Sequence, residues 1–373
     1  AAPIGSLFKV VTGYRALLEE HNKGKGDLNP LTIVDTGPPP APLTAHSQLG
    51  EYQSGKPIYR RHNGGQLPRS HKAIGKTRFL EAMQRSSNLY FSLLAGDILP
   101  RPTDLVHAAA SLGFGEPTGI DMPGEYAGRL PRDMRENKTG LYAFAIGQHA
   151  FTATPLQAGS MLAAIANGGK RPVPHIVIKS TPLRETPLFT SLGKEYLPFT
   201  QAIGLTTPLF TEPLRRSITS TSAPTEVMHH PPVPLPKLVQ SYLCNSLDAV
   251  VWSQEGSAHP YRIRGLYTHP GWYTDYVALR HQLIGKTSTA QRRHKETLDR
   301  EGTSEMVQDT WFGGIAFRDG SQTWDNAQLV IVVYLQHGDW GKEAAPLAAQ
   351  IVTKWRRLVK EYEQVDANKI ERL

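Results

Sequence analysis

Apolar residues recur at helical spacing directly after the N-terminus of the chain. They are Leu7, Val10, Val11, Tyr14, Leu17 and Leu18. One face of an α-helix carries such a set, and Pro3 ahead of the small polar Ser6 is a helix-start signal. We therefore predict an amphipathic helix that begins close to Ser6 and continues to about Glu20.

The C-terminal third of the chain has a different pattern, which predicts a sheet followed by a helix. Residues 311–319 and 327–338 are rich in β-branched and aromatic residues, and the polar turn between them predicts a hairpin. The apolar positions then return to helical spacing. They are Leu347, Ile351, Trp355 and Leu358. We predict an amphipathic helix whose apolar face lies on the sheet.

The middle of the chain combines helical segments with stretches of weak pattern. Helical patterning lies on both sides of a polar turn at residues 86–88, and Thr154 begins a further helix that ends at Asn167. Other stretches are expected to be irregular. They lie at residues 21–70, 170–245 and about 292–309. We interpret the first two as insertions into a single domain that spans residues 1–373.

Composition limits the classes to which the protein can belong. The chain has 373 residues, of which 39% are hydrophobic, and this suffices for one large domain or two ordinary ones. A net charge of +8 suits an anionic neighbour such as cell-wall polymer, lipid head groups or nucleic acid. Nucleic acid is disfavoured because aromatic residues do not interleave with a basic stripe. Cys244 is the only cysteine, so we expect neither an internal disulfide nor a cysteine-rich metal site.

The sequence contains no segment that predicts a membrane span or a cleaved signal. No run of 18 apolar residues occurs, and the first residues lack a charged region followed by an apolar one. The chain begins only five residues before Ser6. We expect an upstream part of the protein to precede it.

Single residues exclude three common ligand-binding motifs. A phosphate-binding loop requires a glycine where Arg280 and Ser70 stand before the two Gly-Lys-Thr sequences. The stretch from Gly113 is not a dinucleotide motif, because Thr118 replaces its last glycine. The pair His229-His230 has no carboxylate or cysteine ligand at a useful spacing. We therefore expect no metal and no cofactor.

Three polar groups remain, and each also has an ordinary structural interpretation. Ser6 and Lys9 share one face of the predicted helix start, but a capping serine with a solvated lysine has the same pattern. Residues 86–88, Ser-Ser-Asn, fit a helix cap as well as a catalytic turn. Residues 286–289, Lys-Thr-Ser-Thr, precede the β-rich tail, where a strand edge offers a cation, hydroxyls and N–H groups to a ligand.

The order of the three groups resembles that of a known family. Ser-x-x-Lys, a Ser-x-Asn-type motif and Lys-Thr-Gly form the signature of penicillin-binding proteins and class A β-lactamases. The chain has Ser6/Lys9, Ser86/Asn88 and Lys286/Thr287 in that order. The sequence between the groups resembles the transpeptidase domain of class B penicillin-binding proteins more than a β-lactamase. The similar blocks are GFGEPTGIDMPGE with GRLP, IGQ with TPLQ and LAAIANGG, GSA, GKTSTAQ, WFGGIAF and AAPLAAQI. The resemblance covers most of the chain from Ala2 to about Lys360 and fades in the two insertions.

The resemblance implies an α+β fold of the penicillin-binding and serine β-lactamase type. In this fold an antiparallel sheet packed by helices lies against an all-helical lobe. Family members place further sheet strands, a pedestal domain and a membrane anchor before the nucleophile. Because the chain begins close to Ser6, we expect only three of the five family strands in it.

The same resemblance implies a serine acyltransferase that cross-links peptidoglycan stem peptides ending in D-Ala-D-Ala and that β-lactams acylate. It implies Ser6 as the nucleophile, Lys9 as the base and Ser86 as the residue that passes a proton to the leaving amine. The backbone N–H groups of Ser6 and Thr289 would form the oxyanion hole. The implied substrate-binding residues are Asn88, Lys286, Thr287, Ser288 and Thr289.

Ser288 departs from the family pattern, which has glycine at this position. A side chain there must point away from the substrate groove or narrow it. Two alternatives to a transpeptidase therefore stay open. One is a penicillin-binding fold kept as a scaffold in a wall-synthesis complex. The other is a β-lactam-hydrolysing or D,D-carboxypeptidase relative, which requires a deacylating base for which the sequence offers no residue.

The resemblance also implies partners and a location. The partners are peptidoglycan stem peptides, β-lactam antibiotics, a membrane glycan polymerase and proteins of cell division or elongation. The location is the bacterial inner membrane, with the catalytic domain on the periplasmic side and the anchor outside this chain. Roles in cell shape and cell division follow from the same family.

Overall fold

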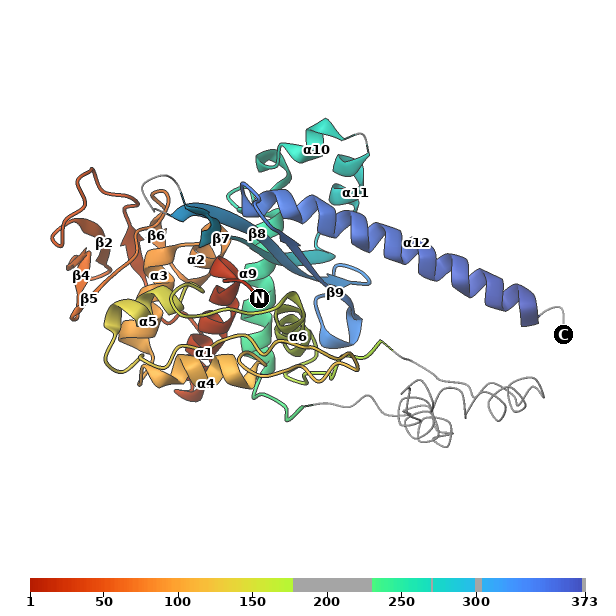
Figure 1. Cartoon of the computed structure of the whole chain (residues 1–373), viewed down its shortest axis with the longest axis horizontal. Coiled ribbons are helices and arrows are strands. Elements are labelled where there is room, and N and C mark those ends of the chain that lie inside the picture. Colours follow the sequence, from red (N-terminus) through yellow and green to blue (C-terminus); the bar gives the residue numbers. More distant parts are fainter. Residues whose placement is uncertain (177–229, 270, 299–303, 371–373) are drawn as a thin grey trace, which may run out of the picture. The chain divides into compact units, whose positions relative to one another are not determined.

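The computed structural model describes residues 1–176, 230–269, 271–298 and 304–370 (Figure 1). The chain divides into two compact units. The larger unit comprises residues 1–118, 126–172 and 230–373, and the smaller unit comprises residues 119–125 and 173–229. Most of the predicted insertion at 170–245 lies outside the described residues.

In the larger unit, helices surround the buried helix that follows Ser6. The helices before the sheet are η1 (Gly5–Phe8), α1 (Lys9–Asn22), α2 (Phe79–Arg85), α3 (Asn88–Leu93), η2 (Leu94–Ile98), α4 (Thr103–Ser111), α5 (Lys138–Phe144), α6 (Pro155–Ala166), α9 (Lys237–Trp252), η4 (Pro260–Arg262), α10 (Gly265–Thr268) and α11 (Trp272–Ala278). η5 (Trp324–Asn326) lies between the last two strands of the sheet, and η6 (Gly341–Ala344) and α12 (Ala345–Ile370) follow it. Val10, Val11 and Leu17 of α1 are fully buried, and each such side chain contributes roughly 2 kcal/mol by leaving water. The predicted N-terminal helix is confirmed, with a 3₁₀ turn, η1, as its start.

A three-stranded antiparallel sheet carries the Lys286 segment. Its order is β7 (Leu283–Leu298), β8 (Ser304–Phe317) and β9 (Ala327–Leu335), as Figure 1 shows. Among the described residues this sheet has the three strands that were expected. Gly313 of β8 lets the sheet approach η1 closely, since a Cβ there would lie 2.8 Å from a methyl carbon of Leu7. This close packing brings β7 to the turn that carries Ser6.

Two stretches expected to be irregular contain strands, so these predictions are wrong. Residues 21–70 hold β1, β2 and β3, which pair with the later β6 in a four-stranded sheet of order β3-β2-β1-β6, and they also hold a β4-β5 hairpin. Their bounds are β1 (Ile33–Asp35), β2 (Gln48–Tyr52), β3 (Pro57–Tyr59), β4 (Arg61–His62), β5 (Gly65–Gln66) and β6 (Gly75–Thr77). The stretch 292–309 is occupied largely by β7 and β8. The strands within residues 21–70 have two to five residues, too few for an alternating pattern to show between glycines and prolines. Residues 292–297 are all polar, so the end of β7 shows no alternation of apolar and polar positions.

Helix α12 confirms the predicted C-terminal helix but buries a different face from the expected one. Leu347 is only partly buried, and Ile351 and Leu358 are 47% and 37% exposed. Up to Tyr362, the last residue of this helix whose burial is described, the fully buried side chains are small. They are Ala345, Ala348, Ala349 and Val352. Close packing against α11 and β9 selects the small residues, so the larger apolar ones lie to the side.

The expected boundaries of α6 and the polar turn between α2 and α3 are confirmed. Thr154 caps α6 by accepting a hydrogen bond from the N–H of Gln157 at 3.1 Å, and the helix ends before Asn167. Between α2 and α3, Ser86 adopts a left-handed backbone conformation with φ of 60°. This conformation is uncommon for residues other than glycine, so the turn that carries Ser86 stores strain.

Candidate active site

Two of the polar groups found in the sequence meet at the side-chain amine of Lys9. Lys9 Nζ lies 2.8 Å from the carbonyl oxygen of Ser86, 3.0 Å from Ser86 Oγ and 2.8 Å from Asn88 Oδ1. The Lys9 side chain is fully buried. The helix start and the Ser-Ser-Asn turn, 77 positions apart from Lys9 to Ser86, therefore form one site.

Lys286 joins this cluster from the sheet. Its Nζ donates hydrogen bonds to Ser86 Oγ and to the carbonyl oxygen of Thr287, both at 2.9 Å. Ser86 Oγ thus lies between two lysine amines. A hydroxyl donates one hydrogen bond and accepts two. Ser86 can therefore accept from Lys286 while it donates to a neutral Lys9.

Burial holds both lysines toward their neutral forms. It lowers the pKa of Lys286 to about 7. For Lys9, burial is the largest cause and the charge of Lys286 is the next, and together they hold its pKa well below the ordinary value. The charge of Asp35 acts on the Lys9 pKa in the opposite direction. A neutral amine near neutral pH is the form that a general base requires.

Ser6 lies in the first turn of η1 and is half-buried. Side chains three apart eclipse each other in a 3₁₀ turn, so Ser6 and Lys9 share one side of it. Gly5 has φ of +51°, and its N–H donates to the carbonyl oxygen of Gly147 at 3.2 Å. A Cβ on Gly147 would lie 2.1 Å from the Gly5 carbonyl oxygen. Both glycines are therefore needed to fix the backbone ahead of Ser6. The N–H of Ser6 lies in the first turn of the helix, where backbone N–H groups have no partner within the helix.

The hydroxyls of Thr287 and Thr289 on β7 contact two separate segments. Thr287 Oγ1 lies 2.7 Å from Ser257 Oγ, in the Gly-Ser-Ala block. Thr289 Oγ1 accepts a hydrogen bond from the N–H of Gly341 at 2.9 Å. An acceptor role leaves the proton of Thr289 Oγ1 available to a ligand.

The side chain of Ser288 is directed toward the segment that precedes Ser6. Its hydroxyl donates to the carbonyl oxygen of Ile4 at 2.7 Å, and the residue is only 2% exposed. A Cβ on Gly5 would lie 2.6 Å from Ser288 Oγ. Ser288 thus stabilises the segment before Ser6, and its hydroxyl proton is used in the hydrogen bond to Ile4.

The sequence reasoning missed a carboxylate behind the turn at residues 86–88. Asp35 is fully buried on β1, and its Oδ2 accepts hydrogen bonds from Ser70 Oγ at 2.6 Å and Ser87 Oγ at 2.5 Å. Ser70 Oγ in turn accepts from the backbone N–H of Asn88 at 3.2 Å. Asp35 therefore anchors the turn at residues 86–88. The only signal in the sequence is an aspartate that follows two β-branched residues.

The described residues contain no group of three histidine, cysteine or carboxylate side chains that could hold a metal ion. His229 of the candidate pair lies outside the described residues. Nε2 of His230 lies 3.0 Å from the carbonyl oxygen of Thr118. In the part of the chain that the structure describes, every helix is too short or too polar to cross a bilayer.

The sequence matches the model of the penicillin-binding protein transpeptidase domain over residues 44–354. The chain belongs to the penicillin-binding protein transpeptidase family. The matched region contains Ser86, Asn88 and Lys286 but begins after Ser6 and Lys9. The hydrogen bonds of Lys9 tie that earlier pair to the matched residues.

Three similar proteins agree with this membership of the penicillin-binding protein transpeptidase family. The peptidoglycan D,D-transpeptidase MrdA of Acinetobacter baumannii is 35% identical over 105 residues, which are 26% of this chain and 15% of the relative. The structure of Pseudomonas aeruginosa PBP2 has a TM-score of 0.58 and 19% identity, over 95% of this chain and 61% of that one. The structure of Helicobacter pylori PBP2 in complex with MreC has a TM-score of 0.57 and 19% identity, over 96% of this chain and 50% of that one. The chain spans less than two thirds of each relative, and its α+β fold is that of the penicillin-binding transpeptidases.

Proposed function

We propose that this penicillin-binding protein domain is a peptidoglycan D,D-transpeptidase that forms an acyl-enzyme on Ser6. The observation that carries the proposal is Ser86 Oγ, which lies 3.0 Å from Lys9 Nζ and 2.9 Å from Lys286 Nζ. Lys9 and Lys286 are buried amines with lowered pKa values, and both contact the hydroxyl of Ser86, which provides a path for protons. A purely structural ion pair would instead require a carboxylate beside one of the amines. The name of the Acinetobacter relative supports the same reaction.

Acylation begins when neutral Lys9 takes the proton of Ser6 Oγ. Ser6 Oγ then attacks the carbonyl carbon of the penultimate D-Ala, and the carbonyl oxygen becomes an oxyanion. The N–H groups of Ser6 and Thr289 hold that oxyanion, and the loss of one such contact costs roughly 3–4 kcal/mol in other enzymes. The C–N bond breaks as a proton passes from Lys9 through Ser86 to the leaving D-Ala nitrogen. An amine of a second stem peptide later takes the acyl group from Ser6.

The remaining residues bind the substrate. Protonated Lys286, with the hydroxyls of Thr287 and Thr289, binds the carboxylate of the terminal D-Ala or of a β-lactam. Asn88 Nδ2 donates one hydrogen bond to the Arg69 carbonyl at 3.1 Å and has a second N–H for the substrate amide. Ser288 contributes through its backbone, because its hydroxyl is bonded to Ile4.

Replacing Ser6 with alanine should abolish covalent labelling by penicillin, since no other hydroxyl occupies the helix start beside Lys9. The test is incubation with labelled penicillin, followed by intact mass and peptide mapping. Ser111→Ala, at an exposed serine at the end of α4, should label like the parent protein. A stable adduct on the Ser6→Ala variant would refute the nucleophile. A folded parent protein that forms no adduct would favour the scaffold alternative.

The rate of penicillin acylation should show a bell-shaped dependence on pH. It should rise as Lys9 loses its proton, through a pKa well below the ordinary lysine value. It should fall as Lys286 loses its charge, through a pKa of about 7. The two amines share Ser86, so the observed values belong to the pair. Lys286→Arg keeps its charge at high pH, so it should lose the descending limb in stopped-flow measurements, and retention of that limb would contradict the assignment.

We also propose that the protein works in a wall-synthesis assembly. The solved complex of Helicobacter pylori PBP2 with MreC supports a protein partner for this fold. The family supports β-lactams and stem peptides as ligands. The proposed location is the periplasmic side of the inner membrane, where the stem peptides occur. The further proposed partner is a glycan polymerase.

A further inference from the structure

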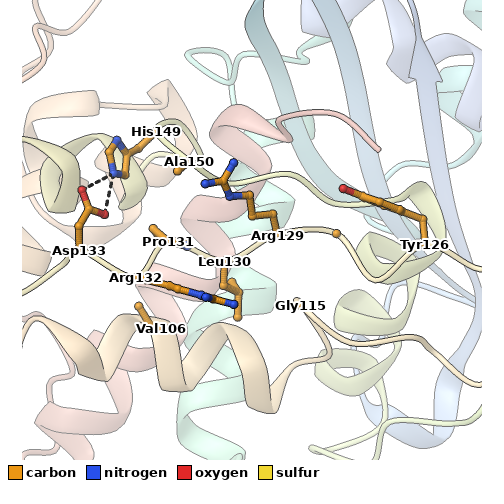
Figure 2. A pocket seen from close by; sticks show the side chains of 11 residues that line it. Val106, Gly115, Tyr126, Arg129, Leu130, Pro131, Arg132, Asp133, His149 and Ala150 are labelled. Carbon is orange, nitrogen blue, oxygen red and sulfur yellow. Dashed lines mark hydrogen bonds and ion pairs between the residues drawn. The ribbon is translucent and has the colours of Figure 1, made fainter.

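An open pocket of about 780 Å³ lies outside the Lys9 cluster (Figure 2). Its walls come from α4 and from the loops on either side of α5. The residues that define it are Val106, Tyr126, Arg129, Arg132, Asp133 and His149. We call it the arginine pocket.

The arginine pocket presents positive charge to a ligand. Among the described residues, neither Arg129 nor Arg132 makes a side-chain hydrogen bond or ion pair, and both are exposed. The carboxylate of Asp133 is already engaged, because it lies 2.9 and 3.1 Å from His149 Nε2 and accepts from Asn137 Nδ2 at 2.7 Å (Figure 2). Among the described residues Asp133 forms no ion pair with either guanidinium group, so two arginine charges face one carboxylate charge in the pocket.

The loop that carries the two arginines is fixed without a ligand. Gly128 has φ of +70°, and a Cβ there would lie 2.5 Å from the Thr152 carbonyl oxygen. The N–H of Arg129 donates to that same oxygen at 2.8 Å. The buried amide of Gln157 donates to the carbonyl oxygens of Ala127 at 2.7 Å and Glu116 at 2.8 Å. A preformed site loses little conformational entropy on binding.

The arginine pocket lies within reach of a substrate attached to Ser6. His149 follows Gly147 by two residues, and Gly147 is hydrogen-bonded to Gly5, the neighbour of Ser6. Chain geometry therefore limits the distance from His149 to Ser6 to roughly 17 Å. An extended peptide of five residues spans roughly the same length.

We propose that the arginine pocket binds a carboxylate of the stem peptide upstream of its D-Ala-D-Ala end. The inference rests on the proposed function, because it assigns a second contact to the same substrate. The planar fork of a guanidinium matches a carboxylate in bidentate geometry. Arg129 and Arg132 are separated by Leu130 and the rigid Pro131, whose fixed φ limits how the backbone between them can bend.

The test measures binding in the Ser6→Ala protein, where no turnover interferes. Two labelled peptides share one sequence ending in D-Ala-D-Ala; one has free carboxylates upstream, and in the other these are amidated. Fluorescence anisotropy should show about tenfold tighter binding of the free form, since two charge-assisted contacts are lost in the amide. Adding Arg129→Gln and Arg132→Gln should remove that preference.

A matched control removes the same charge elsewhere. Arg61→Gln with Arg264→Gln, at exposed positions outside the pocket, should keep the preference. The assignment is overturned if the Arg129/Arg132 variant keeps the preference for the free carboxylates at an unchanged melting temperature. It is also overturned if the control variant loses that preference to the same extent. Each single pocket variant should lose part of the preference, so the inference stays testable if the double variant does not fold.

The labelling of the parent protein by penicillin is read separately. If Ser6 is not labelled while the carboxylate preference depends on Arg129 and Arg132, the transpeptidase proposal fails and the anion site stands. If Ser6 is labelled but no preference exists, the arginine pocket is not a substrate site.

Discussion

Replacing Lys9 with methionine should lower the rate of penicillin acylation by roughly 10³- to 10⁴-fold, the range that a positioned general base contributes. Lys9 follows Ser6 by three residues at the start of the same helix, and methionine keeps its approximate length without any basic nitrogen. Methionine fills a site that is fully buried, but it leaves the Ser86 carbonyl and Asn88 Oδ1 without their donor, so we expect a loss of stability without loss of the fold. Stopped-flow acylation and thermal unfolding of the same preparation measure the two effects.

Lys76→Met is the matched control for this experiment. Lys76 is exposed on β6, within the other Gly-Lys-Thr sequence of the chain. The same exchange there should leave the acylation rate unchanged within about twofold, since exposed substitutions have small effects. Acylation of the Lys9→Met protein at near-parental rate would falsify the role of Lys9 as base and direct attention to Lys286.

The order of the polar groups predicted the site better than any single group did. Ser6 and Lys9 alone fit a capping serine with a solvated lysine. The buried Lys9 amine, 2.8 Å from Asn88 Oδ1, favours a site instead of a cap. Helical periodicity located α1, α6 and α12 because each repeats its pattern over at least three turns. The family resemblance then fixed the pairing of segments that are far apart in the chain.

The supporting structure was less predictable because it depends on tertiary packing. The strands that hold Asp35 are too short to show a period, and the buried face of α12 is set by close approach of neighbours to its alanines rather than by its largest apolar residues. The orientation of Ser288 follows from the position of the Ile4 carbonyl, which no local pattern encodes. The arginine pocket likewise forms from α4 and two loops that only the fold brings together.

Replacing Asp35 with alanine should reduce the free energy of unfolding by about 3–5 kcal/mol, because it leaves several buried donors without an acceptor. Those donors are the hydroxyls of Ser70 and Ser87 and the N–H of Gly37, which lies 3.1 Å from Asp35 Oδ1. The turn at residues 86–88 would lose its anchor, so acylation should fall as well. Urea unfolding followed by tryptophan fluorescence measures the change in stability.

Asp35→Asn separates positioning from folding. The amide keeps one carbonyl oxygen for the two hydroxyls, so the loss of stability should be smaller than with alanine. The charge is removed, however, and the charge of Asp35 raises the pKa of Lys9. Its loss should therefore lower that pKa further and move the ascending limb of the acylation profile to lower pH. Asp27→Asn, at an exposed carboxylate, should leave that limb in place; if Asp35→Asn does the same in a folded protein, Asp35 acts on the fold alone and not on the protonation of Lys9.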